Sequence, residues 1–236
     1  MAGPGLAQTA EPELPFAQAY ARDVALMFFY HEMGHAFIDV LDAPVLGLEE
    51  DAADGLAVLL IDRYWEPDWA EAKARVVADY WWENAPSWSG NAPGEVVTWD
   101  THSPYERRYY TLDCLFYGAN PGARAGFAAD MSLPSDRRET CPSEFELMAK
   151  SWDHFLGPVA GSGGTVTFEA RAAGYGYVAR ALQDEIAYMN ARIVLPQPVP
   201  VILAPCGEAN AFYDPETVSV TICSELIDEA LGMAKA

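Results

Sequence analysis

The chain has 236 residues, with 35 acidic side chains against 14 basic ones and a formal charge of −21. Its length suits one domain with a substantial core, and an apolar content of 51% excludes a disordered chain. The charge argues against nucleic acid and anionic membranes as partners, because both would repel the protein. Apolar runs are too short to span a bilayer, so we expect no membrane insertion. Residues 1–13 lack the basic start and apolar stretch of a signal peptide.

The apolar spacing of residues 16–41 predicts a long, mostly buried helix. This helix contains His31, Glu32 and His35 in the pattern H-E-x-x-H. Two histidines four residues apart project from one helix face, so both can bind one metal ion, with the glutamate beside the metal's open position. The alternative is a pair of buried core histidines, but such polar groups are costly on an apolar helix without a partner. The pattern therefore predicts one Zn²⁺ site with Glu32 as general base.

A third protein ligand is expected from the acidic cluster that opens the next predicted helix. Glu50 and Asp54 are four residues apart and share a face, so one can bind the metal while the other accepts a hydrogen bond from a ligand histidine. Glu49 and Asp51 are rival ligands, since acidic residues in a first turn also favour the helix dipole. We favour Glu50, because it alone forms an i, i+4 pair with Asp54.

The two phrases together resemble the gluzincin branch of the zinc metallopeptidases, whose signature is HExxH followed by ExxxD on a second helix. The resemblance implies that His31, His35 and Glu50 bind zinc. It also implies that Glu32 is the general base and that Asp54 supports a ligand histidine. Residues 30–61, 99–121 and 206–226 are similar to a bacterial family of metallopeptidases whose function is unknown. The implied substrate is a peptide or a protein.

Peptide hydrolysis at zinc also needs a donor that stabilises the oxyanion. Gluzincins commonly use a His or Tyr from a helix downstream of the third ligand, and the resemblance makes His102 the candidate. This residue precedes a helix-like run from Tyr105 to Tyr117. A helix-capping role near Asp100 is an equally good alternative. Tyr109, Tyr110 and Tyr213 are substitutes of lower rank.

The β-strand signal is carried by three late segments, residues 165–169, 199–204 and 217–223. A turn signal at residues 213–216 suggests a hairpin. The fold expected from the resemblance is an α+β zincin, in which the HExxH helix and the second ligand helix pack under a small mixed or antiparallel sheet. The edge strand of such a sheet lines the cleft. We therefore expect residues 217–223, through Val218, Val220 and Ile222, to pair with an extended substrate.

The order of these segments is unexpected, because zincins form their sheet before the HExxH helix. Residues 161–164 (GSGG) have the composition of a flexible linker. If they join two original termini, residues 165–236 once preceded residues 2–160, and the order becomes that of a zincin. We therefore expect one zincin-like domain over residues 1–236 in circularly permuted order. A natural glycine loop is the alternative.

Four cysteines allow three pairings, of which we favour Cys114–Cys141 and Cys206–Cys223. Such bridges would imply export to the periplasm or the medium, with the natural signal peptide removed; four reduced thiols are the alternative. No C-x-x-C spacing predicts a second zinc site.

Two functions rival the peptidase. One is a non-catalytic zinc-binding or interaction module, and the other is a zinc hydrolase of a non-peptide amide. The intact Glu32 favours catalysis, because a structural zinc needs no base and usually has four protein ligands. We expect the protein to act as a monomer.

Overall fold

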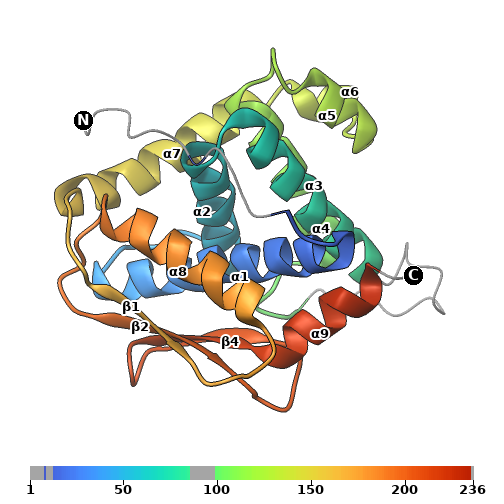
Figure 1. The fold of residues 1–236 in the computed structure, drawn as a ribbon. Coiled ribbons are helices and arrows are strands. Elements are labelled where there is room, and N and C mark those ends of the chain that lie inside the picture. Colours follow the sequence, from blue (N-terminus) through green and yellow to red (C-terminus); the bar gives the residue numbers. More distant parts are fainter. Residues whose placement is uncertain (1–7, 9–12, 86–98, 235–236) are drawn as a thin grey trace. The chain divides into compact units, whose positions relative to one another are not determined.

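The computed structural model describes residues 8, 13–85 and 99–234. Within these ranges the protein is α+β and rich in helix, with one four-stranded sheet (Figure 1). This confirms the α+β class expected from the sequence, and the zincin-like arrangement stays a prediction. The described residues form two compact units, and the single domain expected from the sequence stays a prediction.

The first unit contains residues 13–45 and 154–234. Its helices are α1 (Phe16–Val40), α8 (Gly176–Asn190) and α9 (Ser224–Met233). Its strands are β1 (Val166–Ala170), β2 (Val199–Ala204), β3 (Ala211–Asp214) and β4 (Ser219–Cys223). In this unit α1 packs against β3, β4, α8 and α9, and α8 also packs against β1. The long helix α1 is therefore the element on which the rest of the first unit assembles.

The second unit contains residues 8, 46–85 and 99–153. Its helices are α2 (Glu49–Tyr64), α3 (Pro67–Asn84), α4 (Tyr105–Ala119), α5 (Ala125–Asp130), α6 (Ser135–Arg138) and most of α7 (Cys141–Leu156). Helix α4 contacts α2, α3, α5 and α6, so it is central to this unit. The unit is thus a helical assembly around α4.

The sheet of the first unit has the strand order β1-β2-β4-β3. Strand β2 runs parallel to both β1 and β4, whereas β3 runs antiparallel to β4. The alternation along β2 is regular, since Val199, Val201 and Leu203 are fully buried and the residues between them are partly exposed. The sheet is mixed, as expected, and β1 and β3 are its edges.

The predicted role of residues 217–223 as a substrate-binding edge strand is wrong. Strand β4 forms there, but it pairs with β2 on one side and with β3 on the other, so its backbone groups are already used. Val220 and Ile222 are fully buried in the core. Val218 lies before the strand with a φ of 51°, in the left-handed region. Among the described strands, β3 is instead an edge strand of this sheet that contacts α1, and it is four residues long.

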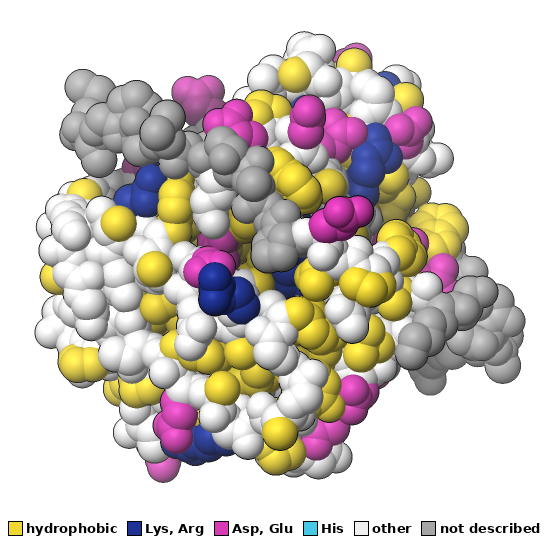
Figure 2. Space-filling view, in the orientation of Figure 1, with side chains coloured by type: hydrophobic (Ala, Val, Ile, Leu, Met, Phe, Trp, Pro, Cys, Tyr) yellow, Lys and Arg dark blue, Asp and Glu magenta, His cyan; other side chains and the backbone are white. Residues whose placement is uncertain are grey.

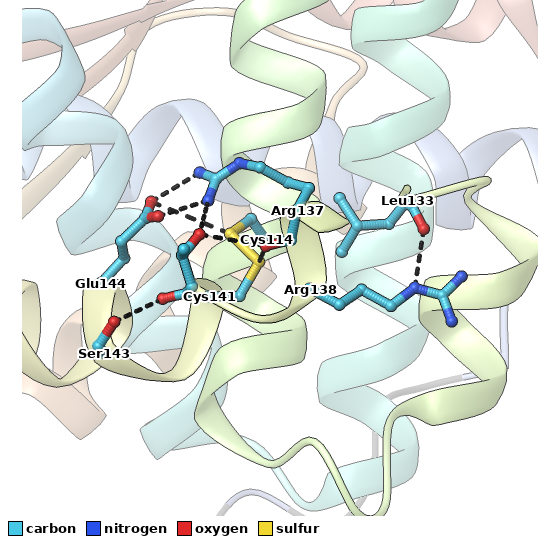
Figure 3. The surroundings of a disulfide bond; sticks show 8 residues. Cys114, Leu133, Arg137, Arg138, Cys141, Ser143 and Glu144 are labelled. Carbon is cyan, nitrogen blue, oxygen red and sulfur yellow. Dashed lines mark hydrogen bonds and ion pairs between the residues drawn. A yellow bond between two sulfur atoms is a disulfide. The ribbon is translucent and has the colours of Figure 1, made fainter. Parts of the chain in front are cut away.

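Two disulfides are present, and they are the pairs favoured from the sequence: Cys114–Cys141 and Cys206–Cys223. Figure 3 shows the first of them, which joins α4 to the start of α7. Here α4 and α7 approach so closely that a Cβ on Gly118 would lie 2.3 Å from the carbonyl oxygen of Cys141. Beside the bridge, Arg137 forms an ion pair with Glu144 (Figure 3).

The face drawn in Figure 2 carries more acidic than basic side chains. Asp and Glu side chains are scattered over its upper, central and lower parts, and Lys and Arg side chains are fewer. Among the described helices, none is long and apolar enough to cross a membrane. Several large apolar side chains are also exposed, among them Phe16, Leu46 and Trp99, as is usual for folded proteins.

One carboxylate of the second unit is completely buried. Asp113 on α4 has no exposed surface, and neither of its carboxylate oxygens has a hydrogen-bond partner in the described part of the chain. Burial raises the pKa of Asp113 to about 8, although the charge of Arg75 opposes the shift. The carboxyl group is therefore held mainly in its neutral form at pH 7.

This buried carboxyl group makes the stability of the protein depend on pH. Between about pH 4 and pH 8 the folded state binds a proton on Asp113 that the unfolded state releases, so the free energy of unfolding falls as pH rises through this window. Asp113→Asn removes this titration. We expect the variant to match the parent near pH 4 and to exceed its free energy of unfolding at pH 7 by roughly 4 kcal/mol. Urea denaturation at both pH values measures this, and a difference that is the same at both would contradict it.

Candidate metal centre

The HExxH residues lie in the middle of α1, in the first unit. Helical geometry places His31 and His35 one turn apart on the same face. His31 and Glu32 are buried, at 3% and 5% exposure, and His35 is partly exposed. The helix therefore holds two imidazoles and a carboxylate in a largely apolar setting.

The two imidazoles converge on one point. Their Nε2 atoms are 3.3 Å apart, and the ring planes are nearly perpendicular, at 78°. Two nitrogen ligands at 2.0–2.1 Å from a tetrahedral Zn²⁺ ion stand about 3.3 Å apart. A hydrogen bond between the rings would have a similar length, and it would require one protonated and one free Nε2 atom. The spacing and the chemistry of these donors fit a zinc ion.

A buried hydrogen bond fixes α1 next to this pair. The hydroxyl of Tyr30, the residue before His31, donates to the carboxylate of Glu185 on α8. Tyr30 is fully buried and Glu185 is 1% exposed. Buried polar groups of this kind specify one arrangement of the elements that carry them, because each would be costly without its partner. Glu185 was not singled out by the sequence analysis. The one feature that could have indicated it is that an acidic residue occupies a position on the apolar face of the amphipathic helix α8.

In the second unit, three acidic residues of the predicted ligand cluster have a basic neighbour. Glu50 on α2 lies 3.1 Å from Nε2 of His102, and Asp51 lies 3.3 Å from Arg107. One turn later, Asp54 accepts two hydrogen bonds of 2.7 Å from Arg108. Glu50 is therefore paired with His102, whereas Asp51 and Asp54 are paired with arginines of α4.

His102 lies between two carboxylates. Its Nδ1 atom is 3.3 Å from Asp100, which also accepts a 2.9 Å hydrogen bond from the backbone N–H of His102. The hydrogen bond with Glu50 raises the pKa of His102, burial opposes this, and the charge of Glu50 and the contact with Asp100 add to the rise. Helix α4 begins after Pro104 without a side-chain cap, so the alternative role of His102 as a cap of this helix is wrong.

Arg108 is a residue of this region that sequence reasoning missed. It is 7% exposed, donates through both Nε and Nη2 to Asp54, and stacks its guanidinium 3.9 Å from the ring centroid of Trp81. Burial lowers the pKa of Arg108, but the charge of Asp54, the hydrogen bonds with Asp54 and the charges of Tyr105 and Glu50 together raise it above its usual value. The guanidinium therefore provides a buried partner for the carboxylate of Asp54 on α2.

The buried pair gives a direct stability test. Arg108→Met leaves the charge of Asp54 buried without compensation, and we expect the free energy of unfolding to fall by about 3 kcal/mol. The neighbouring Arg107→Met removes an exposed ion pair with Asp51 and should cost no more than about 1 kcal/mol. Urea denaturation of both variants checks this. Equal losses for the two arginines would contradict the role given to the buried pair.

The family comparison covers most of the chain. A family model, DUF4344, which carries the description "Putative metallopeptidase", matches residues 6–156 and 177–236. The matched segments contain the HExxH pattern, the acidic cluster of α2 and all four cysteines. The unmatched stretch, residues 157–176, contains the GSGG sequence and β1. No curated protein and no solved structure matches the chain.

Proposed function

We propose that this chain, which belongs to the DUF4344 family of metallopeptidases, is a zinc-dependent peptidase with Glu32 as its general base. The observation that carries the proposal is the arrangement on α1. The Nε2 atoms of His31 and His35 are 3.3 Å apart, and a buried carboxylate stands beside them on the same helix. Two such nitrogen donors leave room for one further protein ligand and one open position, as in catalytic zinc sites.

The third ligand in this proposal is Glu50. Its assignment rests on the spacing from HExxH to ExxxD and on the pairing of its neighbours. Asp51 and Asp54 are paired with Arg107 and Arg108, whereas Glu50 lies beside a histidine. An ionised carboxylate can accept about four hydrogen bonds, so the two bonds from Arg108 do not prevent Asp54 from supporting a ligand histidine.

Zinc, when bound, would supply a Lewis acid and lower the pKa of water. Glu32 accepts the proton of the water that attacks the scissile carbonyl and returns it to the leaving amine. His102 donates a hydrogen bond to the developing oxyanion. In this proposal the Nδ1 contact with Asp100 orients the ring, and the Nε2–H group, which lies 3.1 Å from Glu50, turns from Glu50 to the oxyanion.

The substrate strand of the proposal is β3. An extended peptide can pair with a sheet only at a free edge, and β4 has none. Strand β3 has one free edge and packs on α1, the helix that carries the histidines. Side chains of the peptide would then alternate toward and away from α1.

A test separates this proposal from its two rivals. We expect the parent to bind about one zinc ion per chain and to cleave members of a peptide library. Glu32→Gln should keep the zinc and lose activity by about 10³-fold, because proton transfer is lost while the ligands remain. Glu50→Gln should lose zinc affinity by at least about tenfold, whereas Asp51→Asn should keep it. Metal analysis and mass spectrometry of the products measure both effects.

Three results would contradict parts of the proposal. A zinc-loaded parent that cleaves no peptide would favour the non-catalytic module. Cleavage confined to non-peptide amides would favour the other hydrolase. Equal activity of the parent and Glu32→Gln would remove the glutamate from its role.

The circularly permuted order is a further part of the proposal. Its support is that the stretch unmatched by the family contains residues 161–164, and that strands late in the sequence pack on the early helix α1. A chain with residues 165–236 placed before residues 2–160 should fold with the same helix content and the same zinc stoichiometry. Circular dichroism and metal analysis check this. A reordered chain that stays unfolded would contradict the permutation.

The two disulfides support the proposal that the protein works in an oxidising compartment, either periplasmic or extracellular. Bridges of this kind persist where thiols are not kept reduced. Fractionation of cells that produce the natural protein tests this, and recovery from the cytosol would contradict it.

A further inference from the structure

A hydrogen bond joins the edge strand β3 to α1. The hydroxyl of Tyr213 donates to the carboxylate of Asp39, a residue 174 positions earlier in the chain. Burial, the bond with Asp39 and the charges of Asp39 and Asp214 all raise the pKa of Tyr213, so its hydroxyl remains a donor at neutral pH. Both partners belong to the first unit.

Asp39 lies on the face of α1 that carries the two histidines of the HExxH pattern. Asp39 follows His35 by four residues and His31 by eight, so the three side chains share one face of the helix. One helical turn rises about 5.4 Å, and the bond therefore attaches β3 one turn beyond the second histidine. The contact lies close to the proposed chemistry without being part of it.

The ends of β3 are held by other contacts within its own hairpin. At the start of the strand, the carbonyl oxygen of Asn210 accepts a 3.1 Å hydrogen bond from the backbone N–H of Cys223, which is also bridged to Cys206. At its end, Asp214 accepts a 2.8 Å hydrogen bond from the hydroxyl of Thr217 and closes the turn. These contacts fix the shape of the hairpin. The Tyr213 bond instead fixes the hairpin to α1.

We propose that the Tyr213–Asp39 hydrogen bond is a positioning contact that sets the spacing between the edge of β3 and the His31/His35 face of α1. The inference rests on the proposed function, in which β3 binds an extended peptide. The position of β3 determines the position of a peptide that pairs with it. A displacement of about 1 Å at the reacting carbonyl can lower the rate by as much as 10²-fold. Tyr213 acts through the strand and touches no reacting atom.

The test uses Tyr213→Phe in the full chain, which removes the hydroxyl and keeps the ring. The matched control is Tyr175→Phe, because Tyr175 donates a similar 2.9 Å hydrogen bond to Asp228 in the same unit. The kinetic constants kcat and KM are measured with an extended peptide of about eight residues, which can pair along β3, and with a short acyl-dipeptide amide, which cannot.

We expect Tyr213→Phe to lower kcat/KM for the extended peptide by about tenfold or more and to change it for the short substrate by no more than about twofold. Tyr175→Phe should stay within about twofold on both substrates. Asp39→Ala should reproduce the effect of Tyr213→Phe because it removes the acceptor, and the double variant should add no further loss because both changes break the same bond.

Two outcomes would overturn the inference while the proposed function stands. One is a Tyr213→Phe variant that behaves like Tyr175→Phe, and the other is an equal loss on both substrates, which a general weakening of the fold would produce.

Hydrogen–deuterium exchange over residues 208–216 gives a readout that does not need activity. Exchange there should be faster in Tyr213→Phe than in the parent or in Tyr175→Phe. If the parent cleaves neither substrate, the proposed function fails and exchange alone decides the inference. Faster exchange would then support it, and unchanged exchange would overturn it.

Discussion

The structure of the proposed centre depends on one constraint, the geometry of a single buried helix. Because α1 is regular through its middle, His31 and His35 lie one turn apart and their Nε2 atoms come within 3.3 Å of one another. This distance is the one that two nitrogen ligands adopt around a tetrahedral zinc ion. Any kink or change of register in α1 between these residues would separate the two nitrogens.

The first unit holds α1 in place through contacts that flank the histidines on either side. The residue before His31 is bonded to Glu185 of α8, and Asp39, one turn after His35, is bonded to Tyr213 of β3. The helix thus carries the two histidines between two hydrogen bonds, one fully buried and one at the sheet edge. Hydrogen bonds of this kind choose one arrangement of elements more than they add stability, because each mainly replaces a bond with water.

The features of the fold and of the candidate site that depend on nearby residues could be predicted from the sequence. The HExxH spacing, the span of α1 and strand β2 follow from periodicity and residue spacing, and the two disulfides are the pairing favoured among three possible ones. The sequence could not reveal that β4 is an inner strand, because strand order depends on pairing between distant segments. Strand β3 was missed because four residues, AFYD, carry little periodicity. Glu185, Arg108 and the Tyr213–Asp39 bond were also missed, since each depends on a partner far away in the sequence.

The central claim is that the two histidines of α1 hold zinc together with one carboxylate. X-ray absorption spectroscopy of the zinc-loaded protein tests this most directly. The account predicts two nitrogen ligands at about 2.0–2.1 Å, oxygen ligands at about 2.0–2.2 Å and no sulfur, with the nitrogen shell lost in a variant that lacks His31 and His35. A sulfur ligand, or an unchanged spectrum in that variant, would contradict it.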